Sequence, residues 1–485
     1  MKFKATGKVL GVLLMFYSLT LLSPMIVNYI YHENNAEAFI TGFLITFSVG
    51  FILWILTYKS NKELSPKDGF IVVFLIWLVL GIFGSIPYML SNGLHLTVSD
   101  AVFESMSGIT TTGATVINHL DGLPKSILYY RQQAQFFGGM GIIILAVAIL
   151  PLIGVGGMQL YRAEANGPWK ENKLTPRIME TAKALWIIYI VLTLICIITY
   201  WALGMNLFDA VCYAFSTIGT GGFAPHDTSM AYYANKPQIY IAAMIFMLVS
   251  ATSFALHFVA INRKNIKLYW QDTEFRTYIF HVVIMGLIVS VTLLFHQYYS
   301  SSLKVIIEGF FQVISFATNT GFTSNSDYAS WPLFIPPLLM IIGLIGGCAG
   351  STSGGLKIIR TVLVRQQLAR EMKRLVHPQG VFPIKFGKKV MSESAINSVW
   401  AFIAGYFFIL VVIWIVLMAT GIDPITALSA VSACISNVGP GIAGVSSNYA
   451  SLPEIANWIL CFAMLVGRLE VFTVLVLLMP TFWRR

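Results

Sequence analysis

Apolar runs long enough to cross a lipid bilayer recur from one end of this 485-residue chain to the other. A helix needs about 20 apolar residues to cross a hydrocarbon layer roughly 30 Å thick. Of all residues, 57% are hydrophobic and only 11% are charged, and no segment is long and polar enough to form a separate soluble domain. The sequence therefore predicts an all-α integral membrane protein, because a helix satisfies its own backbone polar groups in lipid.

The first apolar run, residues 9–31, follows Lys2, Lys4 and Lys8, a pattern shared by secretory signal peptides. Its apolar stretch is longer than the roughly 7 to 15 residues of a typical signal-peptide core, and no small-x-small cleavage site follows. We therefore expect a retained first helix and a mature chain that begins near Met1.

The cysteines and histidines form no recognisable disulfide or metal framework. Eight histidines show no HExxH or paired spacing. Five cysteines lie in apolar segments without CxxC spacing, at positions 196, 212, 348, 434 and 461. Neither a disulfide-stabilised fold nor a metal enzyme is expected.

The net charge of +10 follows the expected topology rather than a nucleic-acid surface. Most of the 31 Lys and Arg lie in segments that the successive membrane crossings would place on the same side of the membrane. These segments are the N-terminus, 59–67, 162–183, 263–276, 357–389 and 484–485. We expect these segments, and hence both termini, to be cytoplasmic. The residues expected on the outer side or inside the membrane are Lys125, Arg131, Lys236, Lys304 and Arg468.

From Gly69 onward one pattern recurs four times: a long apolar run, a short weakly apolar segment that ends in a glycine-containing turn, and a second long run. The long runs are 70–91 and 128–150, 182–203 and 238–261, 275–296 and 333–350, and 396–420 and 454–480. A helix pair, 9–31 and 38–58, precedes them. The predicted units are 1–68 for this pair, then 69–160, 161–265, 266–390 and 391–485 for repeats one to four.

The short segments have about ten to fourteen residues, too few to span, which is typical of re-entrant pore helices. Their turns are TTTGA at 110–114, IGTGG at 218–222, TNTGF at 318–322 and SNVGP at 436–440. Aligned by eye, they share a Thr or Val followed by Gly, at Gly113, Gly221, Gly321 and Gly439. The spacings between these glycines are 108, 100 and 118 residues.

The four turns together suggest an ion filter. A dehydrated cation at membrane depth needs oxygen ligands, and backbone carbonyls supply them without a fixed charge. Carbonyls that point the same way require backbone angles that glycine tolerates best. A single such cluster is more simply a tight turn, and the fourfold repetition favours the filter. The candidate ion-binding residues are Thr111, Thr112, Gly113, Ile218, Gly219, Thr220, Gly221, Thr318, Asn319, Thr320, Gly321, Asn437, Val438 and Gly439.

Asp100 and Asp209 open the first two short segments. They suit either ion attraction at a pore mouth or helix N-caps, and we favour the caps. Glu308 and Asp423 are less well aligned, so no ring of four acids is expected.

These motifs resemble the Trk/Ktr/HKT potassium-transporter superfamily, and most closely its bacterial Trk branch with its TrkH-type membrane subunit. The resemblance covers essentially the whole chain and includes the helix pair before the repeats. The residues that carry it are SGITTTGATV at 107–116, FSTIGTGGF at 215–223, ATNTGFTS at 317–324 and SNVGPG at 436–441.

The resemblance implies four membrane-pore-membrane units in a pseudo-fourfold array around one ion pore, with potassium at the filter carbonyls. Family members in which Ser replaces the first filter glycine tend to favour sodium, and Gly113 occupies that position here. Potassium is therefore the expected substrate. No cofactor is expected in this chain.

The second long run of the third unit is interrupted by GGCAGSTSGG at 346–355. Such a segment cannot hold a regular helix and must lie against protein or water. An ordinary cytoplasmic linker is the simpler alternative, and a phosphate loop fits less well because Leu356 separates Gly355 from Lys357. In the family this stretch resembles an intramembrane gate, which here implies gate residues Gly346, Gly347, Gly350, Ser351, Thr352, Gly354 and Gly355.

Arg468 lies within the last long run, where a charge at a helix centre costs about 2.5 to 3.5 kcal/mol on insertion scales. The resemblance places Arg468 opposite the glycine-rich loop, where its guanidinium could bond loop carbonyls and repel a cation. Pairing with Glu470 is the alternative.

The basic stretch 357–389 satisfies the positive-inside rule or contacts anionic lipid. The resemblance implies that it docks a cytosolic TrkA-like regulatory subunit that itself binds ATP/ADP or NAD(H), because this chain has no nucleotide-binding fingerprint. A homodimer is likewise implied by the family alone.

The sequence thus favours potassium uptake across the bacterial inner membrane through a gated, channel-like pore. A proton- or sodium-coupled potassium symporter is the main alternative, for which two inverted repeats and midplane acids would be typical. A membrane enzyme would need a convergent nucleophile, base or metal cluster, and the sequence offers none.

Overall fold

The computed structural model describes residues 3–59, 66–144, 174–299, 301–324, 328–387 and 389–484, and these are almost wholly helical. Within these ranges the strands are β1 (Lys385–Phe386) and β2 (Lys389–Val390), which pair antiparallel. Parts of the expected basic segments 59–67 and 162–183, and of the run 128–150, lie outside the described residues.

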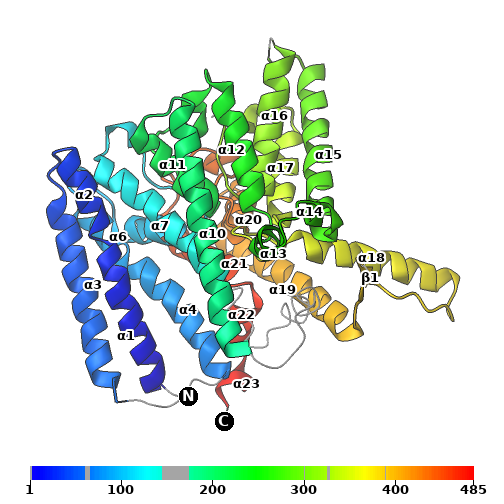
Figure 1. The fold of residues 1–485 in the computed structure, drawn as a ribbon, viewed down its shortest axis with the longest axis horizontal. Helices are drawn as coiled ribbons and strands as arrows, with labels where there is room; N and C mark the ends of the chain where they lie inside the picture. The colour runs from blue at the N-terminus through cyan, green and yellow to red at the C-terminus, as the bar shows by residue number, and fades with distance from the viewer. Residues whose placement is uncertain are drawn as a thin grey trace.

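The expected N-terminal helix pair is present, and its first helix has a break. α1 (Phe3–Thr20) and α2 (Ser23–Ile30) together match the first predicted run, and α3 (Ala36–Thr57) matches the second. α1 packs directly against α3 (Figure 1). The contact is close because neither Gly11 nor Gly50 carries a side chain: a Cβ on Gly11 would lie 2.7 Å from the Gly50 carbonyl oxygen.

The remaining helices follow the predicted alternation of long and short segments. The short helices before the four turns are α6 (Val98–Ile109), α11 (Leu207–Gly219), α16 (Ser302–Ala317) and α20 (Pro424–Ile435). The helices that correspond to the predicted long runs are α4 (Pro66–Phe83), α7 (Lys125–Ile144), α10 (Leu174–Ala202), α12 (Pro237–Ser250), α15 (Thr273–Phe295), α17 (Ile335–Ile345), α19 (Glu393–Met418) and α21 (Glu454–Arg468). The helix α18 (Ile358–Val376) follows the glycine-rich loop. The described residues also form five brief α-helices, α5 (Ile86–Leu90), α13 (Phe254–Asn262), α14 (Lys267–Gln271), α22 (Phe472–Leu478) and α23 (Pro480–Trp483).

Among the described residues, six helices are long and apolar enough to cross a membrane, or up to eight if two bent pairs each count as one span. The bent pairs are α12 with α13, at 91°, and α21 with α22, at 115°. The sequence predicted a break in only one long run, the second run of the third unit (333–350), where α17 has 11 residues. The prediction of unbroken helices over 238–261 and 454–480 was therefore wrong.

The break between α12 and α13 is stabilised by the glycine-rich loop. The Cys348 N–H donates to the Ala251 carbonyl at 2.9 Å, and the Phe254 N–H donates to the Gly350 carbonyl at 3.1 Å. Each interrupted segment thus supplies backbone partners that the other lacks, as non-helical backbone inside a membrane requires. Sequence periodicity carries no information about such an exchange.

Three of the four short helices, α6, α11 and α20, begin at a residue whose side chain caps the helix, and in α6 and α11 this residue is not the expected aspartate. Thr97 caps α6 in a capping box with Asp100, and Asn206 caps α11 by accepting from the Asp209 N–H. The two aspartates are therefore third helical residues rather than N-caps. Asp423 is itself the N-cap of α20.

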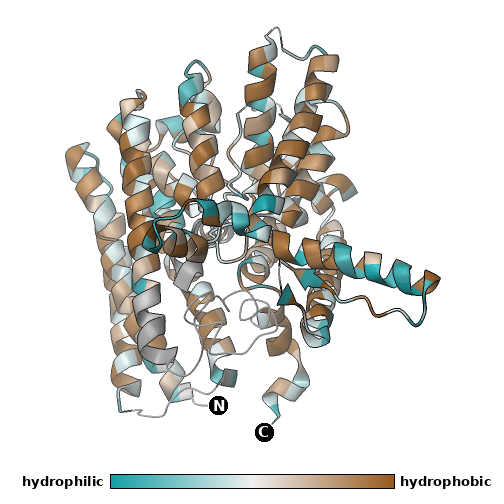
Figure 2. Ribbon diagram, turned by 45° about the vertical axis from the view of Figure 1, so that its right-hand side comes forward, coloured by the Kyte–Doolittle hydropathy of each residue, from teal (hydrophilic) through white to brown (hydrophobic). Residues whose placement is uncertain are grey.

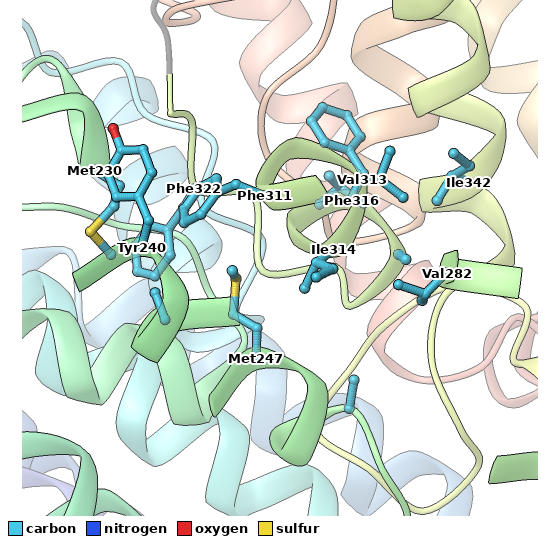
Figure 3. Close-up of a cluster of buried hydrophobic side chains, with 14 of the residues drawn as sticks. Met230, Tyr240, Met247, Val282, Phe311, Val313, Ile314, Phe316, Phe322 and Ile342 are labelled. Carbon is cyan, nitrogen blue, oxygen red and sulfur yellow. The ribbon is translucent and has the colours of Figure 1, made fainter. Parts of the chain in front are cut away.

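The interior is filled by apolar side chains from the short helices and the helices around them. Phe311, Val313, Ile314 and Phe316 of α16 are buried in a cluster with residues from neighbouring elements (Figure 3). Outward-facing positions on the peripheral helices are apolar as well, as on α15, where Leu287 is exposed (Figure 2). An apolar exterior of this kind suits lipid contact.

Substituting Gly50 with Val should disrupt the α1–α3 contact. A Cβ at Gly50 would lie 2.9 Å from the Gly11 carbonyl oxygen, so the helices must separate, at a cost of about 1–3 kcal/mol. We expect a lower thermal unfolding midpoint for the detergent-purified variant. Gly122→Ala is the control, since its Cβ would have no atom of the described residues within 4 Å, and equal midpoints for both variants would contradict the packing argument.

Candidate ion pathway

The four turns that follow the short helices share one backbone conformation. A residue with positive φ, at Thr111, Thr220, Asn319 or Asn437, is followed two residues later by a glycine with positive φ, at Gly113, Gly222, Gly321 or Gly439. Between these two positions lies one residue, which is Thr112, Gly221, Thr320 or Val438. In each turn its N–H donates to the carbonyl five residues earlier in the chain, at 2.8–2.9 Å. The four turns are therefore structurally equivalent residue by residue.

This equivalence corrects the sequence alignment of the second turn. Gly222, with φ 80°, takes the place of Gly113, Gly321 and Gly439, whereas Gly221 corresponds to Thr112. The alignment matched Thr-Gly pairs and so chose a position one residue too early. Ile218 and Gly219, which were predicted as residues of the second turn, instead lie within the last turn of the helix α11.

The four glycines bring the turns together in a closed cycle. A Cβ built on Gly113 would come within 3.0 Å of the Gly221 carbonyl oxygen, and one on Gly222 would meet the Thr320 carbonyl oxygen in the same way. A Cβ on Gly321 would meet the Val438 carbonyl oxygen, and one on Gly439 would meet that of Thr112. Each turn therefore touches the next one along the chain, and the fourth touches the first, with no room for a side chain at any of the four contacts.

Two asparagine side chains connect the third and fourth turns to their surroundings. The Asn319 amide donates to the Gly343 carbonyl at 2.7 Å and to the Ser436 carbonyl at 3.0 Å. The Asn437 amide donates to the Thr112 hydroxyl at 2.9 Å and to the Met464 carbonyl at 3.2 Å. Both residues were predicted as filter residues, but their cross-linking side chains were not foreseen.

A buried ion pair behind the first turn also escaped the sequence analysis. Glu104 of α6 and Arg131 of α7 lie 2.7 Å apart and are both fully buried. The Glu104 carboxylate accepts from the Val116 N–H at 3.1 Å, just beyond the turn. An acid in a short pore-type helix together with an arginine in an apolar run could have indicated this pair, since intramembrane charges are rarely without a partner.

The glycine-rich loop, residues 346–355, lies against the ends of the short helices. The Thr352 hydroxyl contacts the Ile218 carbonyl at 3.2 Å, and the Ser353 hydroxyl donates to the Asn319 side chain at 2.8 Å. A Cβ on Gly354 would overlap the Ser436 carbonyl oxygen. The loop therefore contacts the second, third and fourth of the turn-bearing segments at once.

Arg468, which is 2% exposed, bonds this loop rather than Glu470. Its guanidinium donates to the Thr352 carbonyl at 3.1 Å and to the Gly138 carbonyl of α7 at 3.0 Å. Glu470 instead pairs with Arg360 of α18 at 2.6 Å, so the alternative pairing is wrong. Arg468 thus joins the loop to the second helix of the first predicted unit.

A histidine between two carboxylates connects residues of the first and second predicted units. His226 Nδ1 lies 2.5 Å from Asp121, and Nε2 lies 3.0 Å from Asp209. The Tyr232 ring stacks on the imidazole at a centroid distance of 3.5 Å. Partial burial lowers the pKa of His226, but the hydrogen bonds to Asp209 and Asp121 outweigh it and raise the pKa above its ordinary value.

Because the pKa of His226 is raised on folding, protonated His226 stabilises the protein below its ordinary pKa, and this stability is lost as pH rises through the raised pKa. From about pH 6 to about pH 9 we expect the stability of wild type to fall more than that of His226→Gln, as measured from the thermal unfolding midpoint in detergent. The exposed His296→Gln is the control. Identical pH profiles for wild type and His226→Gln would refute the charged bridge.

Comparisons with known proteins agree with this architecture. A model of the TrkH family, described as a cation transport protein, matches residues 35–484. The Trk system potassium uptake protein TrkH of Escherichia coli K12 is 48% identical over 484 residues, which is 100% of both chains. TrkG of the same organism is 39% identical over 475 residues, covering 98% of this chain and 97% of that one. The crystal structure of the potassium transporter TrkH from Vibrio parahaemolyticus matches with a TM-score of 0.93 and 45% identity over 100% of both chains. The chain therefore belongs to the TrkH family of cation transport proteins.

Proposed function

We propose that this chain is the potassium-conducting membrane subunit of a Trk-type uptake system, with a selective pore at the centre of the four turns. The closed cycle of glycine contacts carries this proposal, because four equivalent units around one axis would bring four turns of the same conformation into contact in this way. These units are the predicted repeats 69–160, 161–265, 266–390 and 391–485, in a pseudo-fourfold array.

The backbone of the turns suits a potassium filter. Alternating signs of φ align successive peptide groups on one side instead of reversing them as in a strand. Four such turns would surround a dehydrated cation with carbonyl oxygens and introduce no fixed charge. In the second turn Gly222 replaces Gly221 as the proposed filter glycine, equivalent to Gly113, Gly321 and Gly439 in the other three turns. The names of the relatives, potassium uptake proteins, support potassium as the ion.

The loop 346–355 is proposed as the gate. It contacts the ends of the turn-bearing segments through Thr352, Ser353 and Gly354, directly alongside the proposed filter. Arg468 places a buried positive charge against the same loop. A loop held in this position would obstruct a cation until its bonds to Arg468 and Asn319 are released.

The basic helix α18 is proposed as the docking element for a cytosolic nucleotide-binding, TrkA-like regulator. Its far end, with Lys373 and Arg374, is exposed and projects from the body of the molecule (Figure 2). Both ends of the chain lie at one end of the molecule, in accord with cytoplasmic termini in a bacterial inner membrane (Figure 1). A homodimer is proposed on the family resemblance.

Cation flux into potassium- or sodium-loaded liposomes tests the pore and its filter. Wild type should carry potassium rapidly down its gradient without a proton or sodium gradient. Gly113→Ser and Gly222→Ser should each reduce selectivity for potassium over sodium by about tenfold or more, because each adds a side chain where no Cβ fits.

Gly122→Ser, at an open position, is the matched control and should retain wild-type selectivity. Flux that stops when the proton or sodium gradient is collapsed would instead support the coupled transporter. Unchanged selectivity in Gly222→Ser would contradict its place in the filter.

Removing the Arg468 guanidinium tests the gate. Arg468→Leu releases the Thr352 carbonyl and removes the buried charge, so potassium flux through the isolated subunit should rise by about tenfold while selectivity is unchanged. The exposed Arg374→Leu serves as the control for loss of a positive charge. A correctly folded Arg468→Leu protein with wild-type flux would argue against a role in closure.

A further inference from the structure

The helix α7 belongs to the first predicted unit, yet it bonds the filter turn of the second. Two of its polar side chains, Arg131 and Gln135, are one helical turn apart and therefore share a face of the helix. Both are 0% exposed, although they lie in a membrane protein beside backbone that has no helical partners. Most buried polar groups are hydrogen-bonded, and these two side chains have partners in or just beyond the filter turns.

Gln135 holds the second turn at two points. Its amide nitrogen donates to the Gly221 carbonyl at 2.7 Å, and its amide oxygen accepts from the Phe223 N–H at 3.1 Å. A Cβ on Gly221 would overlap the Gln135 side chain. This explains the second glycine of the GTGG sequence, because Gly221 makes room for Gln135 while Gly222 makes room for the neighbouring turn.

Arg131 joins the first turn to the second. It pairs with Glu104 and donates to the Thr115 hydroxyl at 3.0 Å, both in the first unit. It also donates to the Ala224 carbonyl at 3.2 Å, and its guanidinium lies 4.2 Å from the centroid of the Phe223 ring. One planar guanidinium therefore connects both turns where they leave the filter.

The fourth predicted unit has no amide side chain at the position equivalent to Gln135. Gly138 of α7 and Gly467 of α21 are equivalent, since a Cβ on either would overlap the carbonyl of the last residue of a short helix, Ile109 or Ile435. Three residues before Gly138 stands Gln135, and three residues before Gly467 stands Met464. The thioether of Met464 cannot donate a hydrogen bond to a carbonyl, so of these two units only the first can make the contact that Gln135 makes.

We propose that Gln135 and Arg131 form a bracket that determines potassium specificity by fixing the spacing between the first and second filter turns. This inference rests on the proposed pore. The two residues are positioning residues that act through the carbonyls of Gly221 and Ala224. A selective site must be held within about 0.5 Å of its working geometry by the residues behind it. Without the bracket, the first two turns can adapt to a smaller cation.

The test compares the same substitution at two positions of α7. Gln135→Met keeps the side-chain volume but removes both contacts to the second turn. Gln133→Met is the matched control: Gln133 is 3% exposed, and its amide bonds the Thr20 carbonyl at 2.8 Å and the Ser23 hydroxyl at 2.7 Å, away from the turns. In liposomes, Gln135→Met should lower the ratio of potassium to sodium flux by about tenfold, and Gln133→Met should leave it unchanged.

Arg131→Lys provides a second, independent variant. Lysine keeps the charge beside Glu104 but cannot bond Thr115 and Ala224 with one planar group, so the flux ratio should again fall. Wild-type ratios in folded Gln135→Met and Arg131→Lys overturn the bracket, as does an equal loss in Gln133→Met. If Gln135→Met does not fold, the Arg131→Lys ratio decides. A wild-type protein without selective passive flux would refute the proposed pore instead, which separates the two failures.

Discussion

The structure depends on four places where backbone meets backbone with no side chain between. A turn inside a membrane exposes carbonyl and N–H groups that lipid cannot satisfy, so such turns persist only when protein or a water-filled path surrounds them. Here each turn is covered by the next one, and the cycle closes on itself. The geometry needs positive φ at two positions per turn, and in the first two turns a threonine adopts it at Thr111 and Thr220, where a β-branched residue is a genuine outlier.

Such a conformation must be held from behind, and the means differ around the cycle. The first and second turns are bonded by Glu104, Arg131 and Gln135, whereas the third and fourth are bonded by their own Asn319 and Asn437. The four turns therefore share a backbone conformation, while the side chains that bond them differ.

The same principle explains the interrupted helices on the other side of the turns. The break after α12 and the loop 346–355 satisfy each other's backbone groups, and Arg468 caps the loop with a buried guanidinium. Lys357 at the end of the loop donates to the Ser353 carbonyl, and Arg360 pairs with Glu470 in the break after α21. The loop, the two broken helices and the start of α18 are thus joined in one network of bonds.

Reading the amino-acid sequence alone is enough to predict the helical membrane class, the two leading helices, the positions of the four turns to within one residue and the place of the interrupted loop. These follow from hydropathy and from glycine content, which are local properties. Tertiary structure decided that Gly222 rather than Gly221 meets the next turn, that α12 and α21 bend, and that Arg468 bonds Thr352 rather than Glu470. Each of these depends on an atom from a distant part of the chain, whose distance in space no local pattern encodes.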